Sequence, residues 1–432
     1  MNGRCVIVGA SLAGLRAAEG LRDAGHDGEI VLVGAERYRP YDRPPLSKAV
    51  LAGKIGADHI DLPERRSIDA DWRLGVAATG LDSAARSLRL SDGGALSYDR
   101  LLVATGTRAS PWPNREEAGL AGVFTLRDRD DVAPLKSRLD ATDGRIVIVG
   151  GGFIGCEIAT ICRHLGRPVT VLERGSAPML RGLGRTLGDL MARRHRAQGV
   201  DLRTGIGVTA LLDDSHGSFT GVRLTDGNLV DADLCIMALG AARNTDWLAG
   251  SGLRTDRLGL HADGYCRALR EDGSPAEDIF VAGDVAVWPS RLFGQQMAIE
   301  HWSNADEQAR TAAFNMVAPG GAMREHDYLP TFWSNQARVT IKAVGMPSIA
   351  DSAAVVQGSL DGDGFVALFG REGRTVGAIS LDRGRYLDFY ARMIRNRAPF
   401  EAAIKTVEGG AAVRFDPGFA HPENQPKKEA RL

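Results

Sequence analysis

In two places along the chain, an apolar run passes into a glycine-rich turn, then a helix-like segment and a second apolar run. In the stronger case, residues 146–149 (Ile-Val-Ile-Val) predict a buried parallel strand. A glycine turn follows at 150–155, then a helical pattern over 157–165 and a second strand over 169–172. This order of elements is typical of a βαβ unit in a doubly wound α/β domain.

The same pattern occurs nearer the N-terminus. Apolar residues 5–8 precede a glycine turn, an amphipathic helix is predicted to about Arg22, and residues 29–33 predict the next strand. Since each unit can bind one dinucleotide, the sequence predicts two Rossmann-like dinucleotide-binding domains in an α/β chain.

Beyond about residue 325 the pattern changes to short strand-like runs separated by turn residues. The predicted strands are 339–344, 353–358, 365–369 and 375–380. A helix over 386–395 ends before Pro399. These elements predict a small C-terminal α+β domain.

The expected domain boundaries follow from these patterns. The first nucleotide domain is discontinuous, 1–112 and 243–324, and encloses the second, 113–242. Residues 111–122 are polar and contain prolines, which is typical of a linker. The C-terminal domain takes 325–405, and the tail 406–432, rich in Pro, Lys and Glu near its end, is expected to be partly disordered.

Composition narrows the class of protein. With 432 residues the chain is too long for a single core. A net charge of −1 gives no general attraction to nucleic acid or membrane, and no apolar run has the length of a membrane span. We expect a cytoplasmic protein. The five cysteines are scattered, without a C-x-x-C pair or the spacing of a metal site, so we expect buried free thiols and no metal.

The turn at 150–155 fits G-x-G-x-x-G, and there is a steric reason for glycine at each of the three positions. Gly150 makes the tight turn, and Gly152 leaves room for a pyrophosphate to approach the backbone. Gly155 lets helix and strand pack closely, and the helix N-terminus directs its N–H groups at the phosphates. Glu173, at the end of the second strand, is placed to bind a ribose 2′-OH.

The N-terminal turn departs from this pattern. Gly9 and Gly14 fit the outer positions, but Ser11 stands in the middle one, and Glu36 is the candidate ribose ligand. Two such turns indicate a bound FAD and an exchanging nicotinamide, as in a flavin-dependent pyridine-nucleotide oxidoreductase. Glu173 favours NADH, because its carboxylate would repel the 2′-phosphate of NADPH, although Arg174 beside it could pair with that phosphate.

Residues 41–48 (YDRPPLSK) resemble the signature loop of the FAD-dependent ferredoxin reductases of bacterial oxygenase systems. Further segments resemble landmarks of this family in the same order, namely 98–106, 126–127, 279–284, 300–305 and 332–336. The resemblance covers roughly residues 4 to 400. It implies a glutathione-reductase-like fold with the small C-terminal domain already predicted. The family usually has proline where Arg243 stands.

The resemblance also implies the cofactor sites. The expected FAD residues are Gly9, Ser11, Ala13, Gly14, Glu36, Arg43, Lys48, Ala78, Ala104, Thr105, Gly106, Arg127, Asp284, Trp302 and Trp333. The expected NAD residues are Gly150, Gly152, Phe153, Ile154, Gly155, Glu157, Glu173, Gly240 and Glu300. From the residues alone, Trp302 and Trp333 fit either the hydrophobic core or an aromatic wall beside the flavin.

The implied reaction passes a hydride from NADH to flavin N5 and then single electrons to a ferredoxin. Lys48 and Glu157 are the expected catalytic pair: the ammonium favours negative charge on reduced flavin, and the carboxylate holds the ammonium. Phe153 is expected to shield the flavin until nicotinamide displaces it. The implied partner is an acidic two-iron two-sulfur ferredoxin, bound transiently, that feeds a haem monooxygenase or a ring-hydroxylating dioxygenase.

Such a partner implies a basic docking face, for which 65–66 and 193–196 are candidates, although both also fit solvated helix surfaces. We expect a monomer or weak homodimer that binds no nucleic acid and no membrane. Alternatives are an NADH reductase of rubredoxin or of a monodehydroascorbate-like radical, and a redox sensor resembling apoptosis-inducing factor. A disulfide, coenzyme-A-disulfide or peroxide reductase would need a redox cysteine, and residues 44–47 (Pro-Pro-Leu-Ser) provide none.

Overall fold

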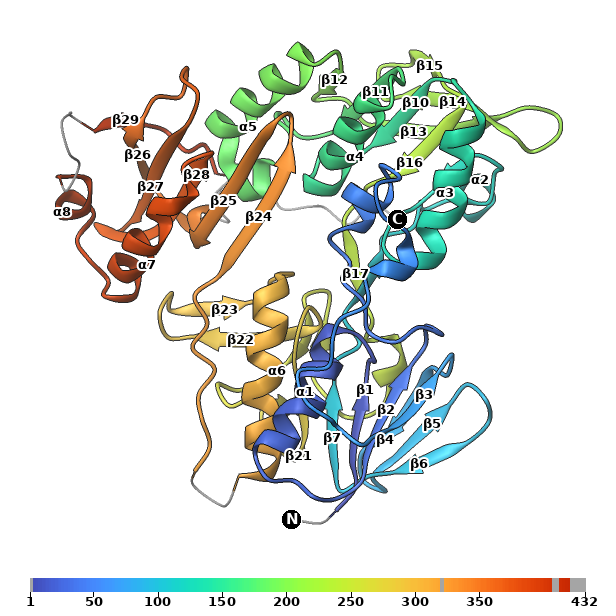
Figure 1. Cartoon of the computed structure of the whole chain (residues 1–432), viewed down its shortest axis with the longest axis vertical. Coiled ribbons are helices and arrows are strands. Elements are labelled where there is room, and N and C mark those ends of the chain that lie inside the picture. Colours follow the sequence, from blue (N-terminus) through green and yellow to red (C-terminus); the bar gives the residue numbers. More distant parts are fainter. Residues whose placement is uncertain (1–2, 319–321, 406–411, 420–432) are drawn as a thin grey trace. The chain divides into compact units, whose positions relative to one another are not determined.

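The computed structural model (Figure 1) describes residues 3–318, 322–405 and 412–419. By its internal contacts the chain divides into two compact units. Unit 1 comprises Met1–Arg43, Asp58–Arg108 and Ala241–Pro330. Unit 2 comprises Pro44–Ala57, Ala109–Gly240 and Thr331–Leu432. Each unit contains one of the two glycine turns.

Unit 1 is built on a mainly parallel sheet in the order β20-β21-β7-β1-β2-β3. Its strands are β1 (Cys5–Val8), β2 (Ile30–Gly34), β3 (Asp71–Leu74), β7 (Arg100–Val103), β20 (Arg267–Leu269) and β21 (Pro275–Val281). Val6 of β1 lies opposite Val31 on one side and Leu101 on the other. All four residues of β1 are buried, as the apolar run predicts for a central parallel strand.

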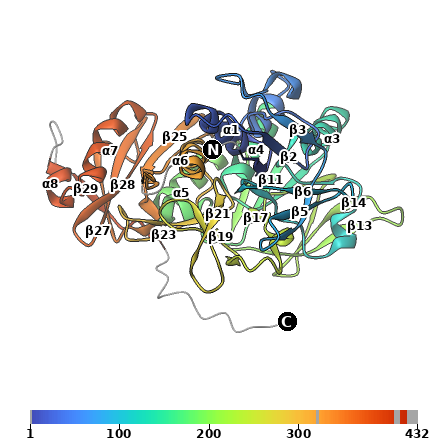
Figure 2. The ribbon, with the colours of Figure 1, turned by 90° about the horizontal axis from the view of Figure 1, so that it is seen from below.

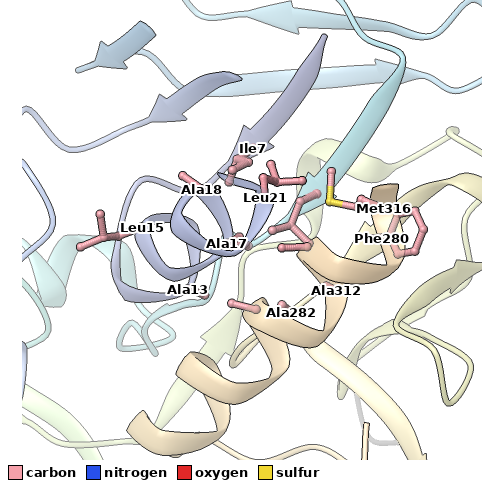
Figure 3. Packing of buried hydrophobic residues seen from close by; sticks show 14 of the residues in the cluster. Ile7, Ala13, Leu15, Ala17, Ala18, Leu21, Phe280, Ala282, Ala312 and Met316 are labelled. Carbon is pink, nitrogen blue, oxygen red and sulfur yellow. The ribbon is translucent and has the colours of Figure 1, made fainter. Parts of the chain in front are cut away.

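Two helices, α1 (Leu12–Asp23) and α6 (Trp302–Val317), pack against each other in unit 1 (Figure 3). Their contact uses small residues, including Ala13, Ala17 and Ala312, beside Phe280 of β21. A Cβ at Gly20 would lie 3.0 Å from the Cβ of Ala313, so the two helices meet with no room for a larger side chain.

The remaining strands of unit 1 form small sheets around this core. They are β4 (Ala78–Asp82), β5 (Ser87–Leu90), β6 (Ala95–Ser97), β17 (Ala241–Arg243), β18 (Thr255–Asp256), β19 (Gly259–His261), β22 (Ala286–Ser290) and β23 (Gln295–Met297). β4, β5 and β6 make an antiparallel sheet, and β18, β19, β22 and β23 make another. β17 pairs with β8 (Thr107–Ala109), where the chain passes between the units.

Unit 2 contains a five-stranded parallel sheet in the order β12-β11-β10-β16-β9. Its strands are β9 (Val123–Phe124), β10 (Ile146–Val149), β11 (Val169–Glu173), β12 (Asp201–Thr204) and β16 (Leu234–Met237). The helices of this part are α2 (Arg115–Ala118), α3 (Arg129–Ala141), α4 (Phe153–His164) and α5 (Leu180–Ala197). A second, antiparallel sheet consists of β13 (Val208–Asp213), β14 (Phe219–Leu224) and β15 (Leu229–Asp231).

The C-terminal part of unit 2 is a six-stranded antiparallel sheet in the order β24-β25-β28-β27-β26-β29, with α7 and α8 beside it (Figure 2). Its elements are β24 (Thr331–Gln336), β25 (Val339–Gly345), β26 (Ser352–Gly358), β27 (Phe365–Arg371), β28 (Arg374–Leu381), α7 (Leu387–Arg395), α8 (Phe400–Lys405) and β29 (Val413–Phe415). The α/β fold class, with two Rossmann-like sheets and a C-terminal α+β domain, is therefore confirmed.

Several predicted boundaries were wrong by a few residues. The helix expected over 157–165 begins at Phe153, directly after the glycine turn, because Gly152 already serves as its N-cap. The signature loop 41–48 runs into a short π-helix, Leu46–Val50, and the polar linker 111–122 contains α2. The motif at 332–336 is a strand, which the sequence analysis did not predict.

The expected disorder of the tail concerns residues 406–411 and 420–432, which lie outside the described residues. Between them, β29 pairs with β26. Within the part of the chain that the structure describes, no helix combines the length and apolar character needed to cross a bilayer. In the same ranges, no cluster of three or more His, Cys, Asp or Glu side chains could hold a metal ion.

Candidate functional site

The glycine turn of unit 1 brings β1, α1 and the end of β7 together. Gly9 has φ +119°, and a Cβ there would lie 2.1 Å from the carbonyl oxygen of Ala104. A Cβ at Gly14 would lie 2.0 Å from the carbonyl oxygen of Gly9, so both positions require glycine. Ser11 is the N-cap of α1, and its side chain makes no capping hydrogen bond. The first N–H groups of α1 thus lack a side-chain cap, as an N-terminus that binds a phosphate requires.

Glu36, just beyond β2, is held by the start of the signature loop. The Tyr41 hydroxyl donates to one carboxylate oxygen (2.5 Å), and the Arg43 guanidinium donates to the other. Arg43 also lies over the Tyr41 ring, 5.0 Å from its centroid. The backbone N–H of Gly75 donates to the Glu36 carbonyl (2.9 Å), which places the segment leading to Ala78 beside this acid. Each carboxylate oxygen has a further lone pair that can accept a ribose hydroxyl.

The late unit 1 residues lie near the start of α1 and the signature loop. Asp284 follows Gly283, whose N–H donates to the Gln308 side chain (2.9 Å). A Cβ at Gly283 would lie 3.2 Å from the Cβ of Ala13, so Asp284 is adjacent to the first turn of α1. The indole N–H of Trp302 donates to Asp42 (2.9 Å).

Glu300, which was expected to contact NAD, is ion-paired with Arg243 (2.7 Å). Arg243 stands where the family usually has proline, and its side chain is 10% exposed. The sequence does not predict this pair, because the two residues are far apart in the chain.

The glycine turn of unit 2 has the same construction with the full motif. Gly150 has φ +112°, and a Cβ at Gly155 would lie 2.1 Å from the Gly150 carbonyl oxygen. Gly152 is the N-cap of α4, and a Cβ there would meet no atom within 4 Å. The open space at Gly152, in front of a helix N-terminus, fits a pyrophosphate.

Glu173 lies at the rim of this turn, as predicted from its place at the end of β11. Its two carboxylate oxygens accept hydrogen bonds from the backbone N–H groups of Gly151 (2.7 Å) and Gly175 (2.6 Å). These bonds fix the carboxylate beside the turn. A lone pair on each oxygen stays available for a ribose hydroxyl.

Lys48 and Glu157, the expected catalytic pair, form an ion pair within unit 2. Lys48 Nζ lies 2.7 Å from Glu157 Oε2 and also donates to the Pro44 carbonyl (3.3 Å). The hydroxyls of Ser47 (2.7 Å) and Ser334 (2.6 Å) donate to Oε2 and Oε1 of the same carboxylate. Glu157 is 4% exposed, so its charge is buried with three donors. A buried carboxylate held in this way keeps the ammonium in one position.

The aromatic residues predicted for the site differ in their surroundings. The Phe153 ring packs edge-on against Phe332, with centroids 5.1 Å apart. Trp333 is 43% exposed and lies on the outer face of β24, so it is not a core residue. Ile154 is 40% exposed in the first turn of α4. The exposed face of Trp333 is consistent with an aromatic wall, and its contact with flavin stays a prediction.

The predicted FAD residues are divided between the units. Lys48, Arg127 and Trp333 belong to unit 2, and the others belong to unit 1. The backbone N–H of Arg127 donates to Asp131 (2.6 Å), at the start of α3. Gly240 follows β16, and its carbonyl accepts from the Ser110 N–H (2.9 Å).

Two serines of this site, Ser47 and Ser334, were not predicted individually, although they lie in the family-like segments 41–48 and 332–336. On β24 the side chains alternate, so Ser334 and Gln336 are buried while Trp333 and Asn335 are exposed. Recognising 331–336 as a strand would have predicted that alternation. Ser47 gives no such signal, because its direction depends on the π-helix.

All five cysteines are free and buried. Burial raises the pKa of every thiol, that of Cys5 and of Cys162 to about 12. Since the thiolate is the reactive form, such thiols are poor nucleophiles.

Most of the candidate docking residues already form ion pairs or hydrogen bonds within their own units. Arg65 pairs with Asp306 (3.0 Å) and Arg66 pairs with Asp23 (2.5 Å). In the second cluster His195 is buried, and the Arg196 side chain donates to the Leu202 carbonyl. The location of a docking face stays a prediction.

Two parallel or mainly parallel sheets, each with a glycine turn at a helix N-terminus and an acid at or after the end of the second strand, define an oxidoreductase that uses two dinucleotides. Residues 3–309 match the family described as pyridine nucleotide-disulphide oxidoreductase, and residues 331–406 match the family described as reductase C-terminal. The chain belongs to the pyridine nucleotide-disulphide oxidoreductase family, whose members use FAD and NAD(H).

Relatives match over nearly the whole chain. The ferredoxin reductase component of chlorobenzene dioxygenase from Cupriavidus sp. (strain PS12) is 34% identical over 92% of this chain and 93% of its own length. The ferredoxin–NAD(+) reductase component of the p-cumate 2,3-dioxygenase system from Pseudomonas putida is 32% identical over 91% and 94%. The structure is similar to the crystal structure of the covalent putidaredoxin reductase–putidaredoxin complex, with a TM-score of 0.87, 31% identity, and coverage of 94% of this chain and 96% of that one.

Proposed function

We propose that this protein is an NADH-dependent ferredoxin reductase of a bacterial oxygenase system. The observation that carries this proposal is the similarity, over nearly the whole chain, to ferredoxin reductase components of dioxygenase systems. The match includes the C-terminal domain, so it covers more than the two nucleotide folds that many oxidoreductases share.

FAD is assigned to unit 1, where Gly9, Ser11 and Gly14 would face its pyrophosphate and Glu36 its adenosine ribose. NAD(H) is assigned to the fold within 113–242, at Gly152 and Glu173. When bound, FAD accepts a hydride from the nicotinamide and releases electrons one at a time. It can therefore transfer electrons from a two-electron donor to a one-electron acceptor. The proposed domains remain 1–112 with 243–324, 113–242 and 325–405.

Lys48 and Glu157 are the proposed catalytic residues. The Lys48 side chain is 22% exposed, and the buried Glu157 carboxylate and the Pro44 carbonyl hold its ammonium group. A fixed positive charge favours a neighbouring group that becomes negative on reduction, because it costs no reorganisation at that moment. Glu157 sets the position of that charge.

The proposed partner is an acidic two-iron two-sulfur ferredoxin that binds transiently to a monomer or weak homodimer. The support is that relatives are named as ferredoxin reductases, and one is crystallised with putidaredoxin. The cysteine surroundings argue against the disulfide-reductase alternative, since all five thiols are buried with raised pKa values.

The test measures NADH-driven reduction of a panel of acceptors by the FAD-loaded protein. We expect turnover with a [2Fe–2S] ferredoxin at least about tenfold faster, as kcat/KM, than with rubredoxin, monodehydroascorbate radical or coenzyme-A disulfide. Faster turnover with the disulfide would contradict the proposal. Slow reduction of every acceptor together with a long-lived reduced complex with NAD would favour a redox sensor.

A further inference from the structure

A row of buried hydrogen bonds runs from the Glu157 carboxylate through β24 to α5, within unit 2. Ser334 donates to Glu157 Oε1 (2.6 Å), and Gln336 Nε2 donates to Ser334 Oγ (2.9 Å). At the far end, His195 Nε2 lies 2.8 Å from Gln336 Oε1. Ser334, Gln336 and His195 are 1%, 2% and 1% exposed.

The direction of each bond follows from the one before it. A carboxylate only accepts, so the single hydroxyl proton of Ser334 points at Glu157. The Ser334 oxygen can then only accept, and the Gln336 amide N–H₂ must face it. This leaves the Gln336 carbonyl oxygen toward α5, so His195 donates from Nε2. Burial lowers the pKa of His195, which agrees with a neutral ring protonated at Nε2.

In each of the three hydrogen bonds, the donor is therefore the residue farther from Glu157. All three bonds point toward the one negative charge of its carboxylate. In a buried environment such bonds polarise one another, and the bond to the charged group is the strong one. The turn that directly follows β24 is also attached to α4, since the Ala337 N–H donates to Thr160 Oγ1 (3.0 Å). Ser334 thus reaches Glu157 from a strand that is fixed against the helix carrying Glu157.

We propose that Ser334, supported by Gln336 and His195, is a positioning residue for the Lys48–Glu157 pair, so that the C-terminal sheet fixes the carboxylate that holds the Lys48 ammonium. The proposal rests on the proposed function, because it takes Glu157 to act in that reaction. Ser47 and Lys48 both bind Oε2, and among the described residues Ser334 is the donor to Oε1. Without it the carboxylate can rotate, and the ammonium that it holds can move.

The experiment compares Ser334→Ala with Ser380→Ala in the FAD-loaded protein. Ser380 is a matched control: it is fully buried in the same sheet, on β28, and its hydroxyl accepts from the Arg383 N–H (3.0 Å) away from Glu157. Stopped-flow absorbance gives the rate constant for flavin reduction by NADH and the half-saturating NADH concentration. Dye equilibration gives the midpoint potential of bound FAD.

We expect Ser334→Ala to slow flavin reduction about tenfold, since a hydrogen bond to a charged group is typically worth about that factor or more. The half-saturating NADH concentration should change less than about twofold, because the effect concerns positioning and not binding. The midpoint potential should become more negative, because a carboxylate that has lost a donor presents more of its negative charge. Ser380→Ala should leave all three quantities within about twofold or unshifted.

A double-mutant cycle separates this proposal from the role of Glu157 itself. In a Glu157→Gln background, Ser334→Ala should change the reduction rate less than about twofold, because Ser334 acts through the charge that is already gone. An equal slowing in both backgrounds, or a slowing by Ser380→Ala as large as that by Ser334→Ala, would overturn the proposal. So would a wild-type rate and potential in Ser334→Ala. A wild-type rate in Glu157→Gln alone would instead refute the proposed catalytic role of Glu157.

If Ser334→Ala does not fold, Gln336→Leu tests the same row one step further away. It removes the donor to Ser334 and places an apolar side chain of similar size beside Met179. The proposal expects a smaller slowing of flavin reduction in the same direction, again lost in the Glu157→Gln background. No slowing in Gln336→Leu would overturn the supporting role of the row.

Discussion

Replacement of Glu173 by glutamine should weaken the preference for NADH over NADPH. The carboxylate is half-buried and lies beside the glycine turn, held by the N–H groups of Gly151 and Gly175. NADPH would bring a 2′-phosphate to the ribose side of this carboxylate. At about 4 Å, two unit charges repel by about 1 kcal/mol in water and about 4 kcal/mol in a typical protein-surface environment. For this half-buried acid we expect about 2–3 kcal/mol, or about two decades in kcat/KM.

The structure adds a second effect of Glu173→Gln. The glutamine amide offers one acceptor oxygen and one N–H₂ group, so it can satisfy only one of the two backbone N–H groups. The other, at buried Gly151 or at Gly175, loses its acceptor, which costs about 1–3 kcal/mol of unfolding free energy. Glutamine is also a weaker acceptor for the ribose hydroxyls of NADH than the carboxylate, so kcat/KM for NADH should fall by a few-fold, while that for NADPH rises relative to it.

The assay is steady-state NADH and NADPH oxidation with ferricyanide as acceptor, for wild type, Glu173→Gln and Arg174→Gln. Arg174 is exposed next to Glu173, and its neutralisation should keep or increase the preference for NADH, since it removes a cation that can pair with the phosphate. Equal kcat/KM for the two nucleotides in wild type, or the same ratio in Glu173→Gln, would refute this reasoning about Glu173.

Four further predictions test other parts of the structure. The purified protein should contain FAD and not FMN, as identified by chromatography of the released flavin. Ser11→Gly should bind FAD at least as tightly as wild type. FMN as the bound flavin would contradict the assignment of the first glycine turn. A variant with all five cysteines replaced by serine or alanine should lose stability, because buried sites leave cavities or unpaired hydroxyls, yet once folded and FAD-loaded it should still reduce ferricyanide with NADH. Lys48→Met should slow flavin reduction by about one to two decades in stopped-flow experiments, since it removes the fixed charge, and an unchanged rate would show that the ammonium is not used. Burial lowers the pKa of His326 to about 4, below its value in the unfolded chain. The free energy of unfolding should therefore decrease as the pH falls from about 6.5 to about 4. Urea unfolding midpoints measured across this range should decrease less in His326→Gln than in wild type.

The sequence by itself determined the two nucleotide folds. The apolar run of β10 has the predicted bounds, Ile146–Val149, and β1 occupies 5–8, because a strand buried on both faces must be continuously apolar. The glycines at positions 9 and 150 are required by backbone geometry with positive φ. Such requirements are local, so they are visible in the order of residue types along the chain.

The tertiary structure decided which side chains meet at Glu157. Its partners Ser47 and Ser334 lie 110 and 177 residues away in sequence, and neither spacing predicts a contact. The alternation along β24 directs Ser334 inward and Trp333 outward, and the π-helix directs Ser47 to the same carboxylate. The pair of Arg243 with Glu300 likewise joins residues from separate elements. These contacts depend on how distant segments pack, because burial and hydrogen bonding act between neighbours in space and leave no period in the sequence.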